Sequence, residues 1–211
     1  MIRCRNEQYA ILLLKNSGLF QKLPNTPKAF DRRSLSRENT SVVVVPSCPF
    51  IPFDENEPTE NRSAYFMRFA YNEALKAWEK GEIPIGAVAV IDEKLVARAH
   101  NVVETNHDPT AHAEMQLIRT LAQKKGDWRL TDVTLYVTKE PCPMCAGAIY
   151  KARIPKVVIG IVDEQQGCLG GCLCLHTALR LYHRVSVEVE PLEGVCERML
   201  KTFFELRRQR A

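Results

Sequence analysis

Two stretches, Thr110-Ala-His-Ala-Glu114 and Pro141-Cys-Pro-Met-Cys145, carry the residues around which the rest of this 211-residue chain can be arranged. Together they supply one imidazole, one carboxyl group and two thiols, and 30 residues separate His112 from Cys142. Catalytic zinc takes three protein ligands of nitrogen or sulfur type and keeps a fourth tetrahedral position for water. We therefore predict that His112, Cys142 and Cys145 bind one zinc ion.

The spacing of these side chains indicates two helix starts. The two cysteines are three residues apart and share a face on a helix, and Pro141 directly before them favours a helix start there. Glu114 is only two residues from His112, so both can face one site only where a helix begins. The segment 108–110, Asp-Pro-Thr, has the residue types of such a start. A helix N-terminus carries a partial positive charge that favours thiolate ligands.

Glu114 is predicted to carry protons rather than to bind the metal. Zinc lowers the pKa of its water from about 15.7 to about 7, and a nearby carboxylate can take that proton and return it to the substrate. The pattern H-x-E…P-C-x-x-C is a known signature of zinc-dependent nucleobase deaminases. Two other interpretations are a redox cysteine pair and a structural zinc site. A structural site needs a fourth ligand, for which His176, Cys168, Cys172 and Cys174 are available.

Composition separates residues 1–58 from the rest of the chain. Before position 40 this segment has eight basic and three acidic residues and no sustained helical or strand period. We predict a weakly basic, disordered extension at 1–58 and a domain with the zinc site at 59–211. The alternatives are an upstream start that the cell does not use, with Met67 as a later start, and an organelle transit peptide.

The overall composition limits the class of protein. A net charge of +4 permits an RNA partner, and eight cysteines, two of them assigned to metal, favour a reducing compartment over a disulfide framework. The longest apolar runs are too short to span a bilayer. A cytoplasmic protein without a membrane partner is expected, although organelle targeting by residues 1–58 stays open.

Hydrophobic periodicity predicts alternating strands and helices, and hence an α/β fold with a mixed sheet of five strands covered on both faces. Helices are expected at 62–80, 111–122, 142–150 and 194–208, and strands at 83–91, 94–100, 133–138, 157–161 and 185–189.

From about residue 62 to 210, the chain resembles the bacterial-type tRNA-specific adenosine deaminases of the cytidine deaminase-like superfamily. The matching segments are Pro84-Ile-Gly86, Val88–Val90, Asn101, Asp108–Glu114, Trp128–Leu130, Thr134–Thr138, Glu140–Ala148, Ala152–Ile154 and Phe203–Gln209.

This resemblance implies a three-layer αβα sandwich, a homodimer with one zinc ion per subunit, and hydrolytic deamination of adenosine to inosine at the wobble position of a tRNA anticodon. It also implies that Glu114 shuttles the proton and that Asn101 contacts the purine. Asp163 matches a position near the RNA backbone, and Arg207 and Arg208 match a basic helix that approaches the anticodon arm. From the residues alone, Asn101 is as well explained as a turn residue, and the arginines as a solvated helix end.

Two features depart from the family pattern, namely residues 1–58 and the cysteine-rich segment 167–174. We predict free thiols at Cys168, Cys172 and Cys174 rather than a second metal site. Two other functions share the zinc chemistry. One is a deaminase of a free base, guanine or cytosine. The other is a zinc-stabilised RNA-binding subunit without activity, which would be expected to lose Glu114.

Overall fold

A computed structural model of the chain describes residues 45–175 and 183–209. Its centre is a five-stranded sheet in the order β2-β1-β3-β4-β5. β1 is antiparallel to β2 and β3, whereas β3, β4 and β5 are parallel to one another. The predicted mixed sheet is therefore confirmed. The strands are β1 (Gly86–Ile91), β2 (Lys94–His100), β3 (Thr134–Val137), β4 (Lys156–Ile159) and β5 (Ser186–Val189).

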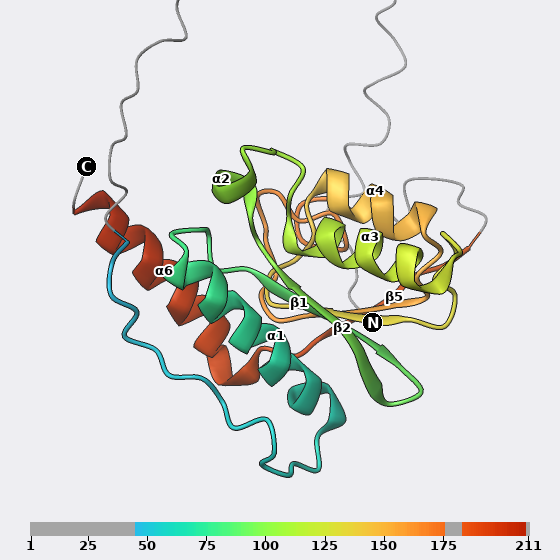
Figure 1. The fold of residues 1–211 in the computed structure, drawn as a ribbon, viewed down its shortest axis with the longest axis horizontal. Coiled ribbons are helices and arrows are strands. Elements are labelled where there is room, and N and C mark those ends of the chain that lie inside the picture. Colours follow the sequence, from blue (N-terminus) through green and yellow to red (C-terminus); the bar gives the residue numbers. More distant parts are fainter. Residues whose placement is uncertain (1–44, 176–182, 210–211) are drawn as a thin grey trace, which may run out of the picture. The chain divides into compact units, whose positions relative to one another are not determined.

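Helices cover both faces of this sheet, as Figure 1 shows. α1 and α6 pack on one face around an aromatic-rich core, and α3 and α4 pack on the other around an aliphatic core. The three predicted layers are thus present. The helices are α1 (Arg62–Glu79), α2 (Val103–Asn106), α3 (Ala113–Lys125), α4 (Pro143–Lys151), the 3-10 helix η3 (Leu192–Gly194) and α6 (Val195–Arg208).

α1 shows how the periodic sequence becomes a packed element. Asn61 caps its N-terminus, because the Asn61 side-chain oxygen accepts the Ala64 backbone N–H at 3.1 Å. The helix lies so close to β1 that a Cβ atom on Gly86 would meet the carbonyl oxygen of Ala70 at 2.1 Å. Only glycine permits this approach. The predicted apolar residues of the helix, Phe66, Phe69, Ala70, Ala74 and Trp78, are all buried.

The predicted hairpin between β1 and β2 is present, with Asp92 and Glu93 as its turn. Both turn residues have left-handed backbone angles, with φ values of 46° and 58°. Such angles at both central positions match the right-handed twist of the flanking strands.

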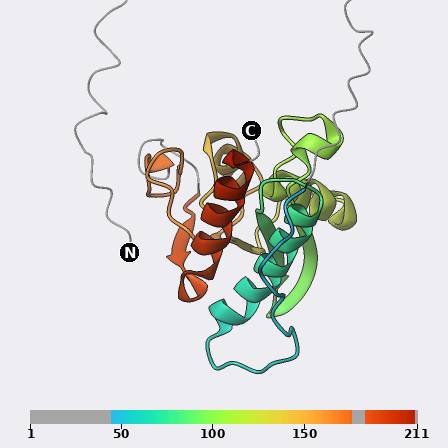
Figure 2. The same ribbon diagram turned by 90° about the vertical axis from the view of Figure 1, so that its left-hand side faces the viewer.

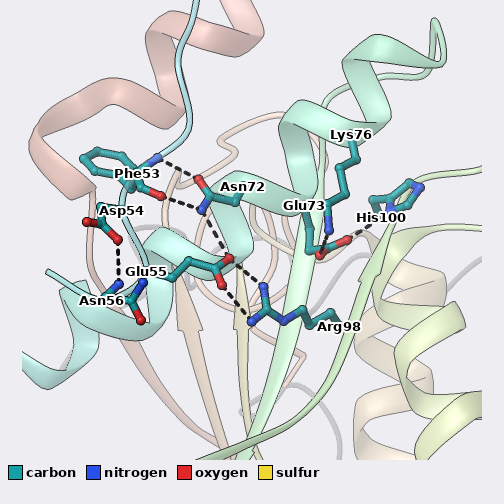
Figure 3. A network of polar contacts seen from close by, with 9 residues as sticks. All are labelled: Phe53, Asp54, Glu55, Asn56, Asn72, Glu73, Lys76, Arg98 and His100. Atoms are coloured by element: carbon teal, nitrogen blue, oxygen red, sulfur yellow. Dashed lines mark hydrogen bonds and ion pairs between the residues drawn. The ribbon is translucent and has the colours of Figure 1, made fainter.

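Residues 45–58, which we name the strap, pack along α1 (Figure 2). The Trp78 indole N–H donates to the Pro46 carbonyl at 2.8 Å. Asn72 donates to the carbonyl of Phe53 and accepts the backbone N–H of Phe53, both at 2.9 Å (Figure 3). The strap thus belongs to the packed structure although its sequence reads as part of the extension. The predictions for residues 1–44 lie outside the described residues.

The end of the strap is also joined to the sheet. Glu55 receives two hydrogen bonds from the guanidinium group of Arg98 on β2, at 2.5 and 2.9 Å (Figure 3).

Within the described ranges, no helix combines the length and the apolar character that a bilayer crossing requires.

Candidate active site

Two helices on the same face of the sheet begin at predicted zinc ligands. His112 is the N-cap of α3 and Cys142 is the N-cap of α4, and both have extended backbones, with ψ values of 154° and 173°. Neither side chain caps its own helix, so both are available to a metal. Glu114 and Cys145 lie in the first turns of the same helices. The expected helix starts are therefore correct, and they explain how residues only two apart reach one site.

The details of both helix starts differ from the prediction. The first residue of α4 is Pro143 rather than a residue directly after Pro141, because proline is well tolerated at the first helical position. Asp108 does not cap α3. Its carboxylate accepts the backbone N–H and the hydroxyl of Thr110 at 2.8 and 2.7 Å, which closes a turn ahead of the helix.

The three ligand atoms fit a tetrahedral zinc ion. His112 Nδ1 lies 3.5 Å from Cys145 Sγ and 3.7 Å from Cys142 Sγ, and the three atoms all lie within 4.8 Å of one another. Zn–S bonds of about 2.3 Å and Zn–N bonds of about 2.0 Å at a tetrahedral angle place N and S about 3.5 Å apart. The side chains are therefore arranged for zinc, and Nδ1 is the ligand atom of His112.

The two thiols differ in how readily they ionise. Hydrogen bonds from the Cys145 thiol and from His112 lower the pKa of Cys142 to about 3. The pKa of Cys145 is raised because its proton is held by Cys142, because the thiol is buried, and because Glu114 is near. The pair therefore favours one thiolate that shares the proton of its neighbour, and zinc binding requires that this proton be released as well.

Glu114 has the environment of a proton carrier. The residue is buried, and this burial raises the pKa of its carboxyl group above the ordinary range of glutamate. A carboxyl group with a raised pKa holds a proton more readily than an exposed glutamate, which suits a group that must accept and return one. It lies in the first turn of α3, two residues beyond the metal ligand His112.

Backbone hydrogen bonds join the chain at Asn101 to the start of β1 and to the segment that leads to His112. The Asn101 backbone N–H donates to Ile85 O at 3.0 Å, and the next residue, Val102, donates to Ala111 O at 3.1 Å. The Asn101 side chain is buried, yet its Oδ1 atom has no hydrogen-bond partner among the residues that the structure describes. A buried polar atom without a partner costs free energy, so this oxygen is free to bind a ligand.

The other three predicted contact residues lie elsewhere. Asp163 forms an ion pair with Lys139, and its Oδ1 atom accepts the backbone N–H groups of Gln165 and Gln166. Arg207 and Arg208 are exposed in the last turn of α6, in the helix layer on the opposite side of the sheet from α3 and α4. The described residues include no direct contact between these three side chains and the zinc ligands.

Comparisons with known proteins identify a zinc-binding region that contains the three ligands described above. Residues 60–161 match the profile of the cytidine and deoxycytidylate deaminase zinc-binding region. The chain is 49% identical over 146 residues to the tRNA-specific adenosine deaminase of Bacillus subtilis, which covers 69% of this chain and 91% of that protein. The corresponding protein of Aquifex aeolicus is 40% identical, over 68% of this chain and 95% of its own length.

The chain belongs to the tRNA-specific adenosine deaminase family.

A solved structure of this family has a fold similar to that of this chain. It comes from work on A-to-I editing by tRNA:A34 deaminases at the wobble position of transfer RNA, and it matches with a TM-score of 0.62 at 37% identity. The match covers 64% of this chain and 98% of that one. A guanine deaminase from Nitrosomonas europaea has a TM-score of 0.53 at 19% identity, over 71% of this chain and 88% of its own, and shares the fold.

Among the described residues, the cysteine-rich segment forms no second cluster of metal ligands. In the described part of the chain, the zinc ligands are the only cluster of three side chains placed to bind a metal. Cys168 and Cys172 carry free thiols, as predicted. The prediction is wrong for Cys174, which is disulfide-bonded, because local spacing reveals nothing about a bonding partner. His176 lies outside the described residues.

The sequence analysis did not predict that two buried carboxylates, those of Glu82 and Glu140, hold the segments around the site. Glu82 accepts the backbone N–H groups of Glu104 and Thr105 at 3.2 and 2.7 Å and so holds α2, the element before the His112 segment. Glu140 accepts three backbone N–H groups from the loop 163–171. The available signal was the position of Glu140 directly before Pro141-Cys142, together with the glycines of the later loop.

Proposed function

We propose that this protein deaminates adenosine to inosine at wobble position 34 of a tRNA anticodon and releases ammonia. The observation that supports this most is the His112–Cys142–Cys145 cluster with Glu114 beside it, in a chain 49% identical to a tRNA-specific adenosine deaminase. The unpaired oxygen of Asn101 adds a hydrogen-bond acceptor for a base. An anticodon loop offers unpaired bases, so little stacking energy is lost when one of them enters the pocket.

The chemistry divides between the metal and the chain. When bound, zinc lowers the pKa of a water molecule to about 7 and so supplies a nucleophile near neutral pH. Glu114 would take one proton from the attacking water and deliver it to ring N1 of adenine, which makes C6 a better electrophile. After addition at C6, Glu114 would take the proton of the added hydroxyl group and pass it to the amino group, so that the C6–N bond breaks and ammonia leaves. The raised pKa of the buried Glu114 carboxyl suits this double transfer.

The remaining roles are part of the same proposal. Asn101 would orient the purine. Asp163, Arg207 and Arg208 would approach the RNA, with Asp163 acting mainly through the loop that its carboxylate already organises. The proposal also includes a homodimer in the cytoplasm with one zinc ion in each subunit.

An inosine assay tests this function. Purified zinc-loaded protein is incubated with an anticodon stem-loop that has adenine at the wobble position, and in parallel with free adenosine, guanine and cytosine. We expect inosine in the RNA alone, and none with Glu114→Ala. Turnover of a free base without any RNA product would assign the protein to the free-base deaminases. Zinc binding without turnover of any substrate would assign it to the non-enzymatic RNA-binding subunits.

A further inference from the structure

A single buried carboxylate, that of Glu140, binds the backbone of the loop 163–171 at three points. Its Oε2 atom accepts the N–H of Asp163 at 2.9 Å, and its Oε1 atom accepts those of Leu169 and Gly171 at 2.7 and 2.9 Å. The residue is 3% exposed, so water competes little for these bonds. Hydrogen bonds to an ionised group are about twice as strong as neutral ones, and a dry environment strengthens them further.

The loop is shaped to fit this carboxylate. A Cβ atom on Gly167 would lie 2.3 Å from Glu140 Oε2, and one on Gly171 would lie 2.4 Å from the same atom. The carbonyl oxygen of Asp163 would also lie 2.6 and 2.3 Å from these two Cβ atoms, so a larger residue fits at either position only if both the carboxylate and the loop backbone move. The close approach of the loop to Glu140 therefore explains why glycine occupies these two positions.

The loop is also tied to the start of α4. The Cys168 backbone N–H donates to the carbonyl of Pro141 at 3.0 Å, and Glu140 itself donates its backbone N–H to Ile161 O at 2.8 Å. Pro141 is thus the only residue between the carboxylate that holds the loop and the zinc ligand Cys142. A shift of the loop would pull on the peptide group that leads directly into this ligand.

We propose that Glu140 is a positioning residue for the zinc site. By holding the loop 163–171 against Pro141, it fixes the Cys142 sulfur where tetrahedral coordination requires it. Hydrogen-bond partners outside the ligand set change metal affinity or activity about 10- to 100-fold in other metalloproteins. The inference rests on the zinc site of the proposed function, but not on the identity of its nucleic-acid substrate.

Asn72 provides a matched control. It is also a buried polar side chain that binds the backbone of an irregular segment, since it both donates to and accepts from Phe53 of the strap (Figure 3). It lies on α1, on the other face of the sheet. A general loss of stability should appear in both variants, whereas an effect on the metal should appear only at Glu140.

The first experiment compares Glu140→Gln with Asn72→Ala. Glutamine preserves the size of Glu140 but places an NH₂ group against one of the N–H donors of the loop. We expect the Gln variant to lose zinc to a chelator about tenfold faster than the wild type or more. Its cobalt-substituted form should show altered visible absorption bands, and kcat should fall with little change in KM. Asn72→Ala should match the wild type in all three. If the two variants behave alike, Glu140 only stabilises the fold and the proposal is wrong.

The second experiment needs no variant and decides the question even if Glu140→Gln does not fold. If the loop holds the zinc ligand, linkage requires that zinc also stabilise the loop. Removal of zinc from the wild-type protein should therefore accelerate hydrogen exchange at the amides of Leu169 and Gly171, but not at the amide of Phe53. Equal changes at all three amides would overturn the proposal. Zinc loss, cobalt absorption and hydrogen exchange do not depend on the identity of the substrate. A failed inosine assay would therefore reject the proposed substrate without deciding this inference.

Discussion

Two buried asparagines on this domain have opposite hydrogen-bonding environments. Asn72 beneath the strap is 8% exposed, and both its oxygen and its nitrogen are bonded to Phe53. Asn101, next to Val102, which is bonded to the segment that leads to His112, is 3% exposed, and its oxygen has no partner within the described ranges. The first side chain stabilises the fold, whereas the second leaves a polar atom unsatisfied at a cost of about 1–3 kcal/mol. Such a cost indicates that a bound ligand supplies the missing hydrogen bond.

The helix starts show the same difference. α1 begins at Asn61, whose side chain caps the helix, but α3 and α4 begin at His112 and Cys142, whose side chains do not. A capping side chain contributes about 1 kcal/mol. On the face with the zinc site, two helices lack this contribution because their first residues are directed to the metal. α6, which packs on the same face as α1, begins at Gly194 and also has no side-chain cap. The difference in capping therefore lies between α1 and the two helices of the zinc site, and substitutions can test it.

The largest effect is expected at Glu114. Glu114→Gln removes the proton carrier and should lower kcat by about 10²- to 10⁴-fold, which is the range of general acid–base catalysis. Zinc content and the free energy of unfolding should stay close to those of the wild type, because glutamine preserves the shape. Inosine formation, metal analysis and urea unfolding of the same preparation measure all three quantities. Activity within threefold of the wild type would refute the role of Glu114.

On the opposite face, Trp78→Ala should do the reverse. Trp78 is fully buried, contacts Phe203 with ring centroids 5.0 Å apart, and donates to Pro46. The substitution should lower the free energy of unfolding by about 3–5 kcal/mol, while kcat/KM of the folded protein stays unchanged. Urea unfolding and assays well below the melting temperature measure the two effects. A tenfold fall in kcat/KM would show that the faces are coupled.

The asparagine pair sharpens the comparison. Asn72→Ala should cost about 2 kcal/mol of unfolding free energy, because it removes two backbone hydrogen bonds and leaves the groups of Phe53 unpaired. Asn101→Ala should cost less than about 0.5 kcal/mol, since the oxygen that it removes is unpaired, but it should raise KM for the RNA. Unfolding curves and steady-state kinetics on both variants measure this. The comparison fails if Asn101→Ala is the less stable variant.

A smaller effect is expected at the start of α3. Asparagine is a strong N-cap residue, and the N-cap His112 makes no capping hydrogen bond. His112→Asn should abolish zinc binding, yet it should raise the stability of the metal-free domain by about 0.5–1 kcal/mol. Thermal unfolding of both proteins in a chelator measures the difference. A metal-free variant less stable than the metal-free wild type would show that His112 stabilises the helix start in another way.

The smallest effect concerns pH at the strap. Hydrogen bonds from Arg98 hold the pKa of Glu55 below its usual value of about 4.3. Because the pKa is lower in the folded state, this stabilisation is present above about pH 4.3 and is lost as the pH falls through the folded value. Glu55→Gln should therefore be less stable than the wild type at pH 7 by at most about 1 kcal/mol, and this deficit should shrink as the pH falls through the folded pKa of Glu55. Urea unfolding at several pH values measures this, and a deficit independent of pH would contradict it.

The sequence predicted the elements that depend on local pattern. The period of α1, the two-residue turn at Asp92-Glu93 and the spacing of the zinc ligands are all short-range signals. The strap was not recognised because it contains no regular element, and its contacts join residues about 20 to 30 positions apart. The binding of the loop by Glu140 was missed for the same reason, since those hydrogen bonds span 23 to 31 residues.

The strand order has a consequence for how the protein is made. α1, β1 and β2 come from consecutive residues, and the hairpin of β1 and β2 needs nothing that follows it. In the folded protein, the cysteine ligands are brought to His112 by β3, which pairs with β1 and leads directly into α4. During synthesis, a ribosome-bound chain that ends before residue 142 contains His112 but no site for tight zinc binding. We therefore expect metal loading to be a late event in biogenesis, so that zinc shortage would lead to an already folded scaffold without metal.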